Sequence, residues 1–313
     1  MILKQRIDKL TAILFGVLIS TQLWASNIPQ KLLNTPITLT TGEVVTLAQY
    51  QNKQPVYLKF WASWCQPCLK EMPHFEHVQK QYGNKIKVIG INLGLNDDLE
   101  AVQTVQKKFN LTMPLAFDKD GNLAQTFRLL ATPYHLLFDK QMNLIHVGNK
   151  ASAALDNKLG LISQQKSIDL LNPQAIAKTG RDIPIELNDG NIHGLFFTAA
   201  WCDWYLESSR PKMSQHCISY QKNINALYKQ YPEVKWQGIL TRLWTGKKEL
   251  AEYKLKYNIQ HPLAIDFSNQ LFYKFNIKDL ATLLFVKDGK ILYKASSKSL
   301  TDIKEQLRYL MNE

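Results

Sequence analysis

Two cysteines separated by two residues are the part of this sequence best suited to chemistry. Cys65 and Cys68 follow an apolar segment at 56–61 that predicts a buried strand. The residues after them predict a helix, so Cys65 lies at a helix N-terminus, where unpaired N–H groups and the helix dipole favour a thiolate. Cys68 comes one turn later and faces the same sulfur. We therefore expect Cys65 to attack a substrate disulfide and Cys68 to resolve the mixed disulfide.

Two other interpretations of this pair are a structural disulfide and half of a zinc site. A zinc ion would need two more ligands at matching spacing. The remaining cysteines, Cys202 and Cys217, are far from the pair and widely spaced from each other. The spacing therefore favours redox chemistry, and we predict no metal and no cofactor.

The composition is that of a soluble globular protein with two domains. The chain has 313 residues, of which 45% are hydrophobic and 20% charged. Its net charge is +12, from 38 basic and 26 acidic residues. The basic residues are spread along the chain instead of clustering with aromatic residues. We therefore expect a solvated basic surface and no nucleic-acid partner.

The first 25 residues have the pattern of a secretory signal peptide. Three basic residues precede an apolar stretch at 10–23 that is too short to span a membrane comfortably. Small residues follow the expected cleavage position, but Leu23 is not small, so an uncleaved membrane anchor is the alternative. Export to the periplasm, an oxidising compartment, makes disulfide chemistry the expectation for all four cysteines. Membrane contact is expected only if the signal is retained.

Two parts of the chain repeat each other 148 positions apart. The sequence PLAFD at 114–118 returns as PLAID at 262–266, with aromatic residues on both sides in the same register. Each half also has an apolar segment that ends shortly before a Trp-Cys dipeptide. We predict two domains, at 28–166 and 183–313, each ordered as strand, helix, strand, helix, hairpin and helix, and joined by a linker at 167–182.

The run around the first two cysteines resembles a known family. The stretch from Phe60 to Pro73, FWASWCQPCLKEMP, resembles the thioredoxin superfamily, in particular its exported TlpA/ResA/CcmG-like branch. The resemblance covers the first domain, and the repeat then implies a second, degenerate thioredoxin-like domain. The implied fold class is α/β, with two tandem thioredoxin-like domains that each have a central mixed β-sheet flanked by helices.

The resemblance also implies which residues form the substrate groove. The family has a cis-proline that faces the redox pair, and Thr132 and Pro133 stand at that place. An ordinary trans turn is the alternative. Trp64 and Pro67 belong to the same site, with Trp64 shielding it.

Near the cysteine pair, Lys59 departs from the family pattern, whereas Glu71 and Pro73 resemble it. Lys59 stands where thioredoxins have a buried aspartate, six residues before the first cysteine, and its charge could favour the thiolate. Glu71 resembles the acidic residue that ResA-like proteins place near their cysteines and could handle a proton. A solvated helix glutamate is the alternative. Pro73 should kink the helix.

The second domain has lost the redox motif. Cys202 takes the place of the first redox cysteine, but Tyr205 stands where the resolving cysteine would be, and Leu280 or Ala281 replaces the cis-proline. A structural disulfide from Cys202 to Cys217, 15 residues further on, could stabilise the fold by about 3 kcal/mol. A second redox centre or a regulatory switch is the alternative.

The resemblance implies a thiol-disulfide oxidoreductase that mostly acts as a reductant in the periplasm. The partners it implies are exported proteins with disulfides and, as electron donor, a membrane thiol-reductant transporter of DsbD type. Alternatives are a disulfide-forming oxidase or isomerase, and a redox-gated binding protein or chaperone whose second domain holds clients. Trp201, Trp204 and Tyr205 would form a binding face in that domain, or else belong to its core.

Overall fold

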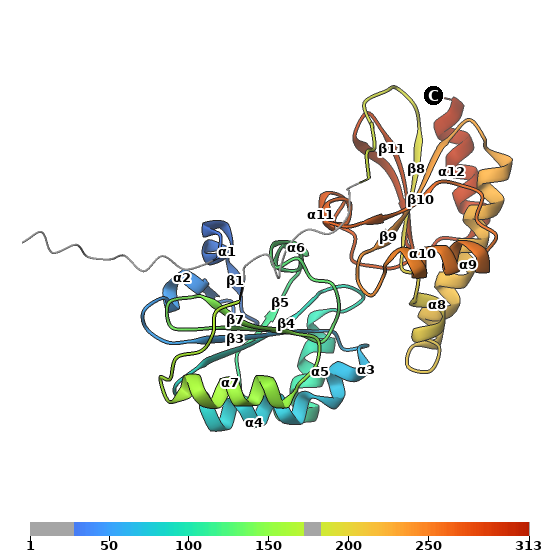
Figure 1. Cartoon of the computed structure of the whole chain (residues 1–313). Coiled ribbons are helices and arrows are strands. Elements are labelled where there is room, and N and C mark those ends of the chain that lie inside the picture. Colours follow the sequence, from blue (N-terminus) through green and yellow to red (C-terminus); the bar gives the residue numbers. More distant parts are fainter. Residues whose placement is uncertain (1–27, 172–182, 313) are drawn as a thin grey trace, which may run out of the picture.

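The computed structural model describes residues 28–171 and 183–312 (Figure 1). The predicted signal at 1–25 and the part of the predicted linker at 172–182 lie outside the described residues. We call the elements from α1 to α7 domain 1 and those from β8 to α12 domain 2. Domain 1 consists of α1 (Gln30–Asn34), β1 (Ile37–Thr38), β2 (Val44–Val45), α2 (Leu47–Tyr50), β3 (Val56–Trp61), α3 (Gln66–Lys70), α4 (Met72–Tyr82), β4 (Lys87–Asn92), α5 (Leu99–Phe109), β5 (Leu115–Phe117), α6 (Asn122–Thr126), β6 (Tyr134–Phe138), β7 (Leu144–Gly148) and α7 (Ala153–Ser163). Domain 2 consists of β8 (His193–Thr198), α8 (Cys202–Tyr205), α9 (Pro211–Gln230), β9 (Lys235–Thr241), α10 (Lys247–Lys256), β10 (Leu263–Asp266), α11 (Gln270–Lys274), β11 (Thr282–Lys287), β12 (Lys290–Ala295) and α12 (Leu300–Asn312).

Domain 1 is built around a five-stranded mixed sheet in the order β5-β4-β3-β6-β7. β3 pairs in parallel with β4 on one side and antiparallel with β6 on the other. Helices α4 and α7 cover one face of this sheet and α6 lies on the other, so all six residues of β3 are buried (Figure 1). A strand buried on both faces has to be a nearly continuous apolar run. The one charged residue in it, Lys59, therefore needs a buried partner.

Domain 2 repeats this topology strand for strand. Its sheet has the order β10-β9-β8-β11-β12, with the same parallel and antiparallel pairings. The predicted fold class of two tandem thioredoxin-like domains is confirmed. The predicted order of elements was incomplete, because each domain has another strand and short helix before the hairpin, β5 with α6 and β10 with α11. These strands have three and four residues, too few for a periodic pattern to appear.

The two domains differ in length just after the redox motif. From β4 to β6, each element of domain 1 recurs 148 positions later, but β3 and β8 begin 137 positions apart. Domain 2 is therefore longer by eleven residues in this region, which holds the loop at 206–210 and the 20-residue helix α9. By the same offset Trp64 corresponds to Trp201, and Cys65 to Cys202.

The helix that follows the redox cysteines is broken, not merely kinked. α3 ends at Lys70 and α4 begins at Met72, with Glu71 between them at φ −92° and ψ −1°. Pro73 is the cause, since a proline has no N–H for the helix ladder and its ring collides with the carbonyl four residues earlier. Pro73 thus stands in the first turn of a new helix, where proline is tolerated.

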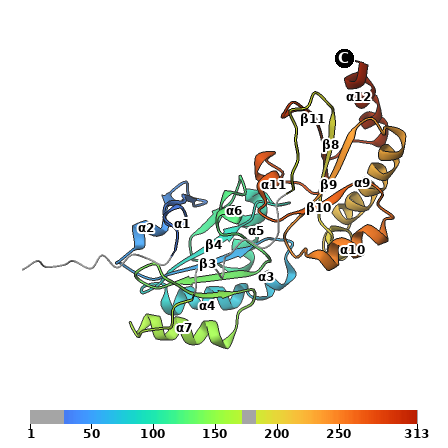
Figure 2. The same cartoon turned by 45° about the horizontal axis from the view of Figure 1, so that its top comes forward.

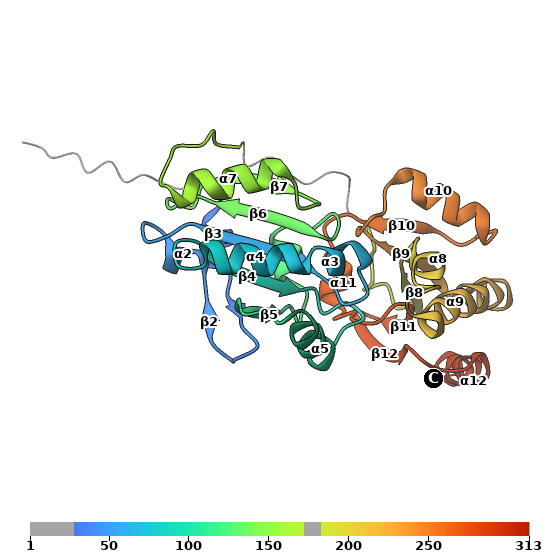
Figure 3. The ribbon, with the colours of Figure 1, turned by 90° about the horizontal axis from the view of Figure 1, so that it is seen from below.

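The domains lie side by side, and in the described residues one continuous apolar core extends through both. Helices α6 and α11, which are equivalent in the repeat, contact each other (Figures 1 and 2). Seen from below, α3 and α11 lie at the boundary between the domains (Figure 3). No helix within residues 28–171 and 183–312 is both long and apolar enough to cross a membrane.

Candidate active site

Cys65 and Cys68 form a disulfide at the start of α3, with 2.05 Å between their sulfurs. Cys65 is the N-cap residue of the helix, and its Sγ accepts a hydrogen bond from the N–H of Cys68 at 3.2 Å. Because a helix N-terminus leaves such N–H groups without partners, this donor stabilises a thiolate on Cys65 once the pair is reduced. Both cysteines are 0% exposed. Both sulfurs of the pair are therefore covered.

A buried polar network lies behind the redox helix. The pairing of β3 with β6 places Lys59 opposite His135. Glu71 joins them: its Oε2 lies 3.2 Å from Lys59 Nζ and 3.1 Å from His135 Nε2, and its Oε1 accepts the N–H of Ala151 at 2.8 Å. Tyr57 Oη lies 2.7 Å from His135 Nδ1. Since a carboxylate only accepts, His135 Nε2 carries the proton and Nδ1 accepts from the tyrosine hydroxyl.

The electrostatics of this network follow from its burial. Burial lowers the pKa of Lys59 to about 8, although the charge of Glu71 acts to raise it. Burial acts to raise the pKa of Glu71, but the hydrogen bond from His135, the charge of Lys59 and the N–H of Ala151 outweigh it and lower the pKa to about 2. Burial lowers the pKa of His135. At neutral pH the network therefore holds a charged Lys59–Glu71 pair beside a neutral imidazole.

A cleft of about 650 Å³ ends at the redox loop. Pro67, Thr132 and Pro133 line its domain 1 side. The Thr132–Pro133 peptide bond is cis, and within the described structure the buried Thr132 Oγ1 has no hydrogen-bond partner. Pro67 stands between the two cysteines in the chain. A molecule bound in this cleft therefore contacts the redox loop at Pro67.

Domain 2 supplies the other wall of the cleft and covers the redox loop. Trp64 stacks on Trp201 with 4.9 Å between ring centroids, and Trp244 meets both rings edge-on. Tyr205 Oη accepts a hydrogen bond from the N–H of Gln66 at 3.0 Å. Trp64 thus shields the site by packing against a second domain.

Arg210, in the loop that lengthens domain 2, makes a polar contact with the redox loop. Its guanidinium donates to the carbonyl of Asn96 at 3.0 Å and to Ser63 Oγ, and lies 3.3 Å from Asp97 Oδ1. The Asp97 carboxylate is buried and also accepts from the Ser63 N–H and the Asn92 amide, both at 2.7 Å. Burial raises the pKa of Asp97 against these hydrogen bonds. Because Ser63 belongs to the redox loop, this network ties domain 2 to it.

Backbone contacts across the boundary come in equivalent pairs. The N–H of Asn96 donates to the carbonyl of Lys278 at 2.7 Å, and the N–H of Trp244 donates to the carbonyl of Leu130 at 3.0 Å. Asn96 and Trp244 are 148 positions apart, as are Leu130 and Lys278, and both donors have a left-handed φ of 53°. Each hydrogen bond is therefore the counterpart of the other. A twofold axis produces such self-complementary contacts in a homodimer, and here they relate two halves of one chain.

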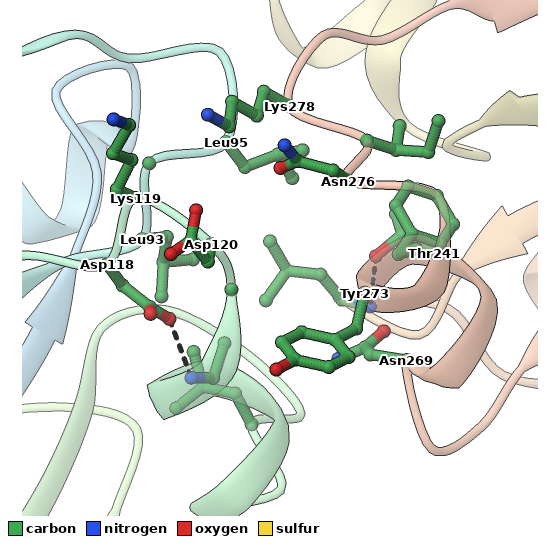
Figure 4. Close-up of a pocket in the computed structure, with 17 residues that line it drawn as sticks. Leu93, Leu95, Asp118, Lys119, Asp120, Thr241, Asn269, Tyr273, Asn276 and Lys278 are labelled. Atoms are coloured by element: carbon green, nitrogen blue, oxygen red, sulfur yellow. Dashed lines mark hydrogen bonds between the residues drawn. The ribbon is translucent and has the colours of Figure 1, made fainter. Parts of the chain in front are cut away.

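A second cavity, of about 70 Å³, lies on the same boundary (Figure 4). Leu95 and its equivalent Leu243 both line it. Figure 4 shows Lys119 and Asp120 of domain 1 across the cavity from Tyr273 of domain 2. None of its lining residues belongs to the larger cleft. Only the larger of these two cavities has a residue of the redox loop, Pro67, in its lining.

Domain 2 cannot carry out the same exchange. Its Cys202 is joined to Cys217 of α9 in a disulfide, and both are buried. Tyr205 occupies the resolving position, and the Leu280–Ala281 bond is cis although it contains no proline. The disulfide links the two ends of the segment 202–217, which includes the loop at 206–210. A structural role for this disulfide stays a prediction.

Three contacts of the site were not predicted from the sequence. His135 carried one signal, a histidine inside the apolar run YHLLF, which indicates a buried polar partner. The sequence carried no signal for the contacts of Arg210 and of the Tyr205 hydroxyl, because their partners lie in the other domain. Within the described residues no group of three or more His, Cys, Asp or Glu could hold a metal ion.

Known proteins match this chain over domain 1. Residues 28–147 match the AhpC/TSA family. The thioredoxin-like protein YneN of Bacillus subtilis is 33% identical over 124 residues, which are 39% of this chain and 72% of YneN. This chain belongs to the thioredoxin-like family.

Two further matches of this thioredoxin-like protein are to proteins of Bacillus. The thiol-disulfide oxidoreductase ResA of Bacillus thuringiensis is 32% identical over 113 residues, 36% of this chain and 64% of ResA. The crystal structure of StoA from Bacillus subtilis aligns with a TM-score of 0.35 and 23% identity, covering 40% of this chain and 95% of StoA. The similarity to YneN and ResA, together with the Cys65–Cys68 disulfide at the start of α3, makes this chain a thioredoxin-like oxidoreductase. The matches to YneN and ResA cover little more than a third of the chain.

Proposed function

We propose that this oxidoreductase reduces disulfides of exported proteins in the periplasm. One observation carries the proposal: Cys65 caps α3, and Pro67, two residues further on, lines a cleft together with Pro133. This is the arrangement that a dithiol exchange with a polypeptide requires, since the thiolate is stabilised and a substrate segment can lie against it. The signal predicted at 1–25 supports export.

The reaction consists of two exchanges. The Cys65 thiolate attacks one sulfur of the substrate disulfide, forms a mixed disulfide and releases the other substrate sulfur as a thiolate, which takes up a proton. Cys68, after losing its proton, attacks the Sγ of Cys65, closes the Cys65–Cys68 disulfide and releases the second substrate thiol. Two electrons pass to the substrate. A dithiol donor then restores the pair, and a membrane transporter of DsbD type is the donor that we propose.

We infer that the buried network favours the ionised form of Cys68. The N–H of Glu71 donates to the carbonyl of Cys68 at 3.2 Å, so the network lies one turn from the resolving thiol. Lys59 has a pKa of about 8, close to the value of roughly 8.5 for a free thiol. Because Lys59 is charged at neutral pH, it favours the thiolate of Cys68, whose proton passes to the substrate thiolate that the first exchange released.

The reduction potential of the Cys65–Cys68 pair tests the direction of the reaction. Mature protein is equilibrated with graded glutathione or dithiothreitol, and free thiols are counted by mass spectrometry. A potential near or below about −250 mV supports a reductase, whereas one near about −120 mV identifies a disulfide donor and contradicts the proposal.

Single-cysteine variants test the two roles. Cys65→Ser is expected to abolish reduction, and Cys68→Ser is expected to trap a mixed disulfide with the substrate. Protection of client proteins that survives Cys65→Ser would instead support a binding protein. Recovery of the protein in the periplasmic fraction tests its location.

A further inference from the structure

The cleft beside the redox loop has a negatively charged aromatic wall that belongs to domain 2. Glu249 and Glu252 of α10 line it together with Trp204 and other aromatic side chains. One lysine of the described chain, Lys256, also lines it, but its Nζ lies 2.8 Å from the buried carboxylate of Asp203. That lysine is therefore neutralised by its neighbour. The charge left to meet a ligand is negative.

The two glutamates are available to a ligand to different degrees. Glu249 is engaged at the start of α10, where its Oε2 accepts the N–H of Gly246 at 2.8 Å. The ion pair described for Glu252 is with Lys248 at 3.8 Å, and their side chains are 65% and 80% exposed. An exposed pair of this kind contributes little stability. Glu252 can therefore exchange Lys248 for a cation of the ligand at little cost.

Trp204 is the exposed aromatic residue of this wall. It is 59% exposed and meets Tyr205 edge-on, with 5.8 Å between ring centroids. Its position corresponds in the repeat to Pro67 of the redox loop. An indole that stays open to solvent beside a carboxylate suits a cationic side chain, because an aromatic face attracts Lys or Arg by about 0.5–2 kcal/mol.

We infer that this cleft holds the substrate segment next to its reacting cysteine and selects a lysine or arginine there. The inference rests on the proposed reductase function. Cys65 has no exposed surface in this structure, so the substrate segment binds first in the cleft, between Pro67 and Pro133 on one wall and domain 2 on the other. Its sulfur reaches Cys65 when the redox loop is uncovered, while its neighbouring side chains lie against domain 2. A basic side chain there meets Glu252 and Trp204, whereas an acidic one is repelled.

Three matched peptide disulfides test this selection. Each is a symmetric dimer of one short peptide with a single cysteine, preceded by Arg, Gln or Glu. The cleavage rate constant of the reduced full-length protein is divided by that of dithiothreitol on the same peptide, which removes differences in intrinsic reactivity. We expect the arginine peptide to react about tenfold faster than the glutamate peptide, with the glutamine peptide between them.

Variants assign the preference to the cleft. Glu252→Lys is expected to bring the ratio of the arginine-peptide rate to the glutamate-peptide rate close to one. Trp204→Ala is expected to slow cleavage of the arginine peptide by about threefold. Glu305→Lys on α12, outside the cleft and exposed, makes the same change in net charge and should keep the wild-type ratio. A ratio that survives Glu252→Lys, or that Glu305→Lys lowers equally, overturns the inference.

A neutral small disulfide separates this inference from the proposed function. Wild-type protein that cannot reduce hydroxyethyl disulfide contradicts the proposed reductase itself. Protein that reduces it and yet cleaves the three peptides at equal corrected rates contradicts only the selection of basic segments.

Discussion

Removal of the Arg210 side chain should expose Cys65. The guanidinium bonds to Asn96 and Ser63 across the domain boundary and pairs with the fully buried Asp97. Hydrogen bonds to charged groups contribute about 1.5–3 kcal/mol each, but Arg210 is partly exposed, so we take about 2 kcal/mol for Arg210→Met. At about 1.4 kcal/mol for each factor of ten, the population in which the redox loop is uncovered rises about thirtyfold.

The assay is the rate at which excess iodoacetamide alkylates Cys65 in the reduced protein, followed by mass spectrometry. Because Cys65 has no exposed surface when the domains are together, alkylation follows the open population, and Arg210→Met should react up to about thirtyfold faster than wild type. Arg308→Met, which removes an exposed arginine of α12, is the matched control. Equal rates for the two variants would refute the reasoning that Arg210 keeps domain 2 over Cys65.

Three further predictions concern stability. The pKa of Glu71, about 2, lies below the ordinary 4.5, so this residue stabilises the fold above pH 4.5 and the contribution is lost as the pH falls toward 2. In urea unfolding, Glu71→Gln should reduce the loss of unfolding free energy between pH 4.5 and 2. An unchanged loss over this pH range would contradict this. The pKa of Lys59, about 8, lies below the ordinary 10.5, so stability should rise with pH between these values, and Lys59→Met should remove that rise in the same assay. Replacing Cys202 and Cys217 together by alanine should lower the free energy of unfolding by about 3 kcal/mol while reduction of a small disulfide persists, and loss of that reduction would indicate that the second pair takes part in electron transfer.

Features that are local in the sequence could be predicted. The Cys-x-x-C motif, the apolar run before it and the repeat together indicated the redox helix, the central strand and the tandem architecture. Pro73 marked the end of a helix, although its effect was underestimated, because its clash and missing N–H fall where α3 would have to continue into α4.

Features that depend on long-range pairing could not be predicted. Lys59 and His135 become neighbours only through the register between β3 and β6, which no local pattern specifies. The aromatic residues of domain 2 were equally ambiguous, because a buried tryptophan gives the same sequence signal in its own core and against another domain. Trp201 packs across the boundary on Trp64, whereas Trp236 packs within its own sheet on Phe285.

The repeat-related contacts of Asn96 and Trp244 join two domains of one chain, and this affects how much binding energy is needed to keep domain 2 over the cysteines. Since both halves belong to one chain, closure is an intramolecular event, and the effective concentration of tethered modules is on the order of millimolar. Two separate subunits with the same contacts would come apart on dilution, but a tandem chain closes to the same extent at any protein concentration. Contacts that would be too weak to hold two separate subunits together can therefore suffice to keep Cys65 covered in a tandem chain.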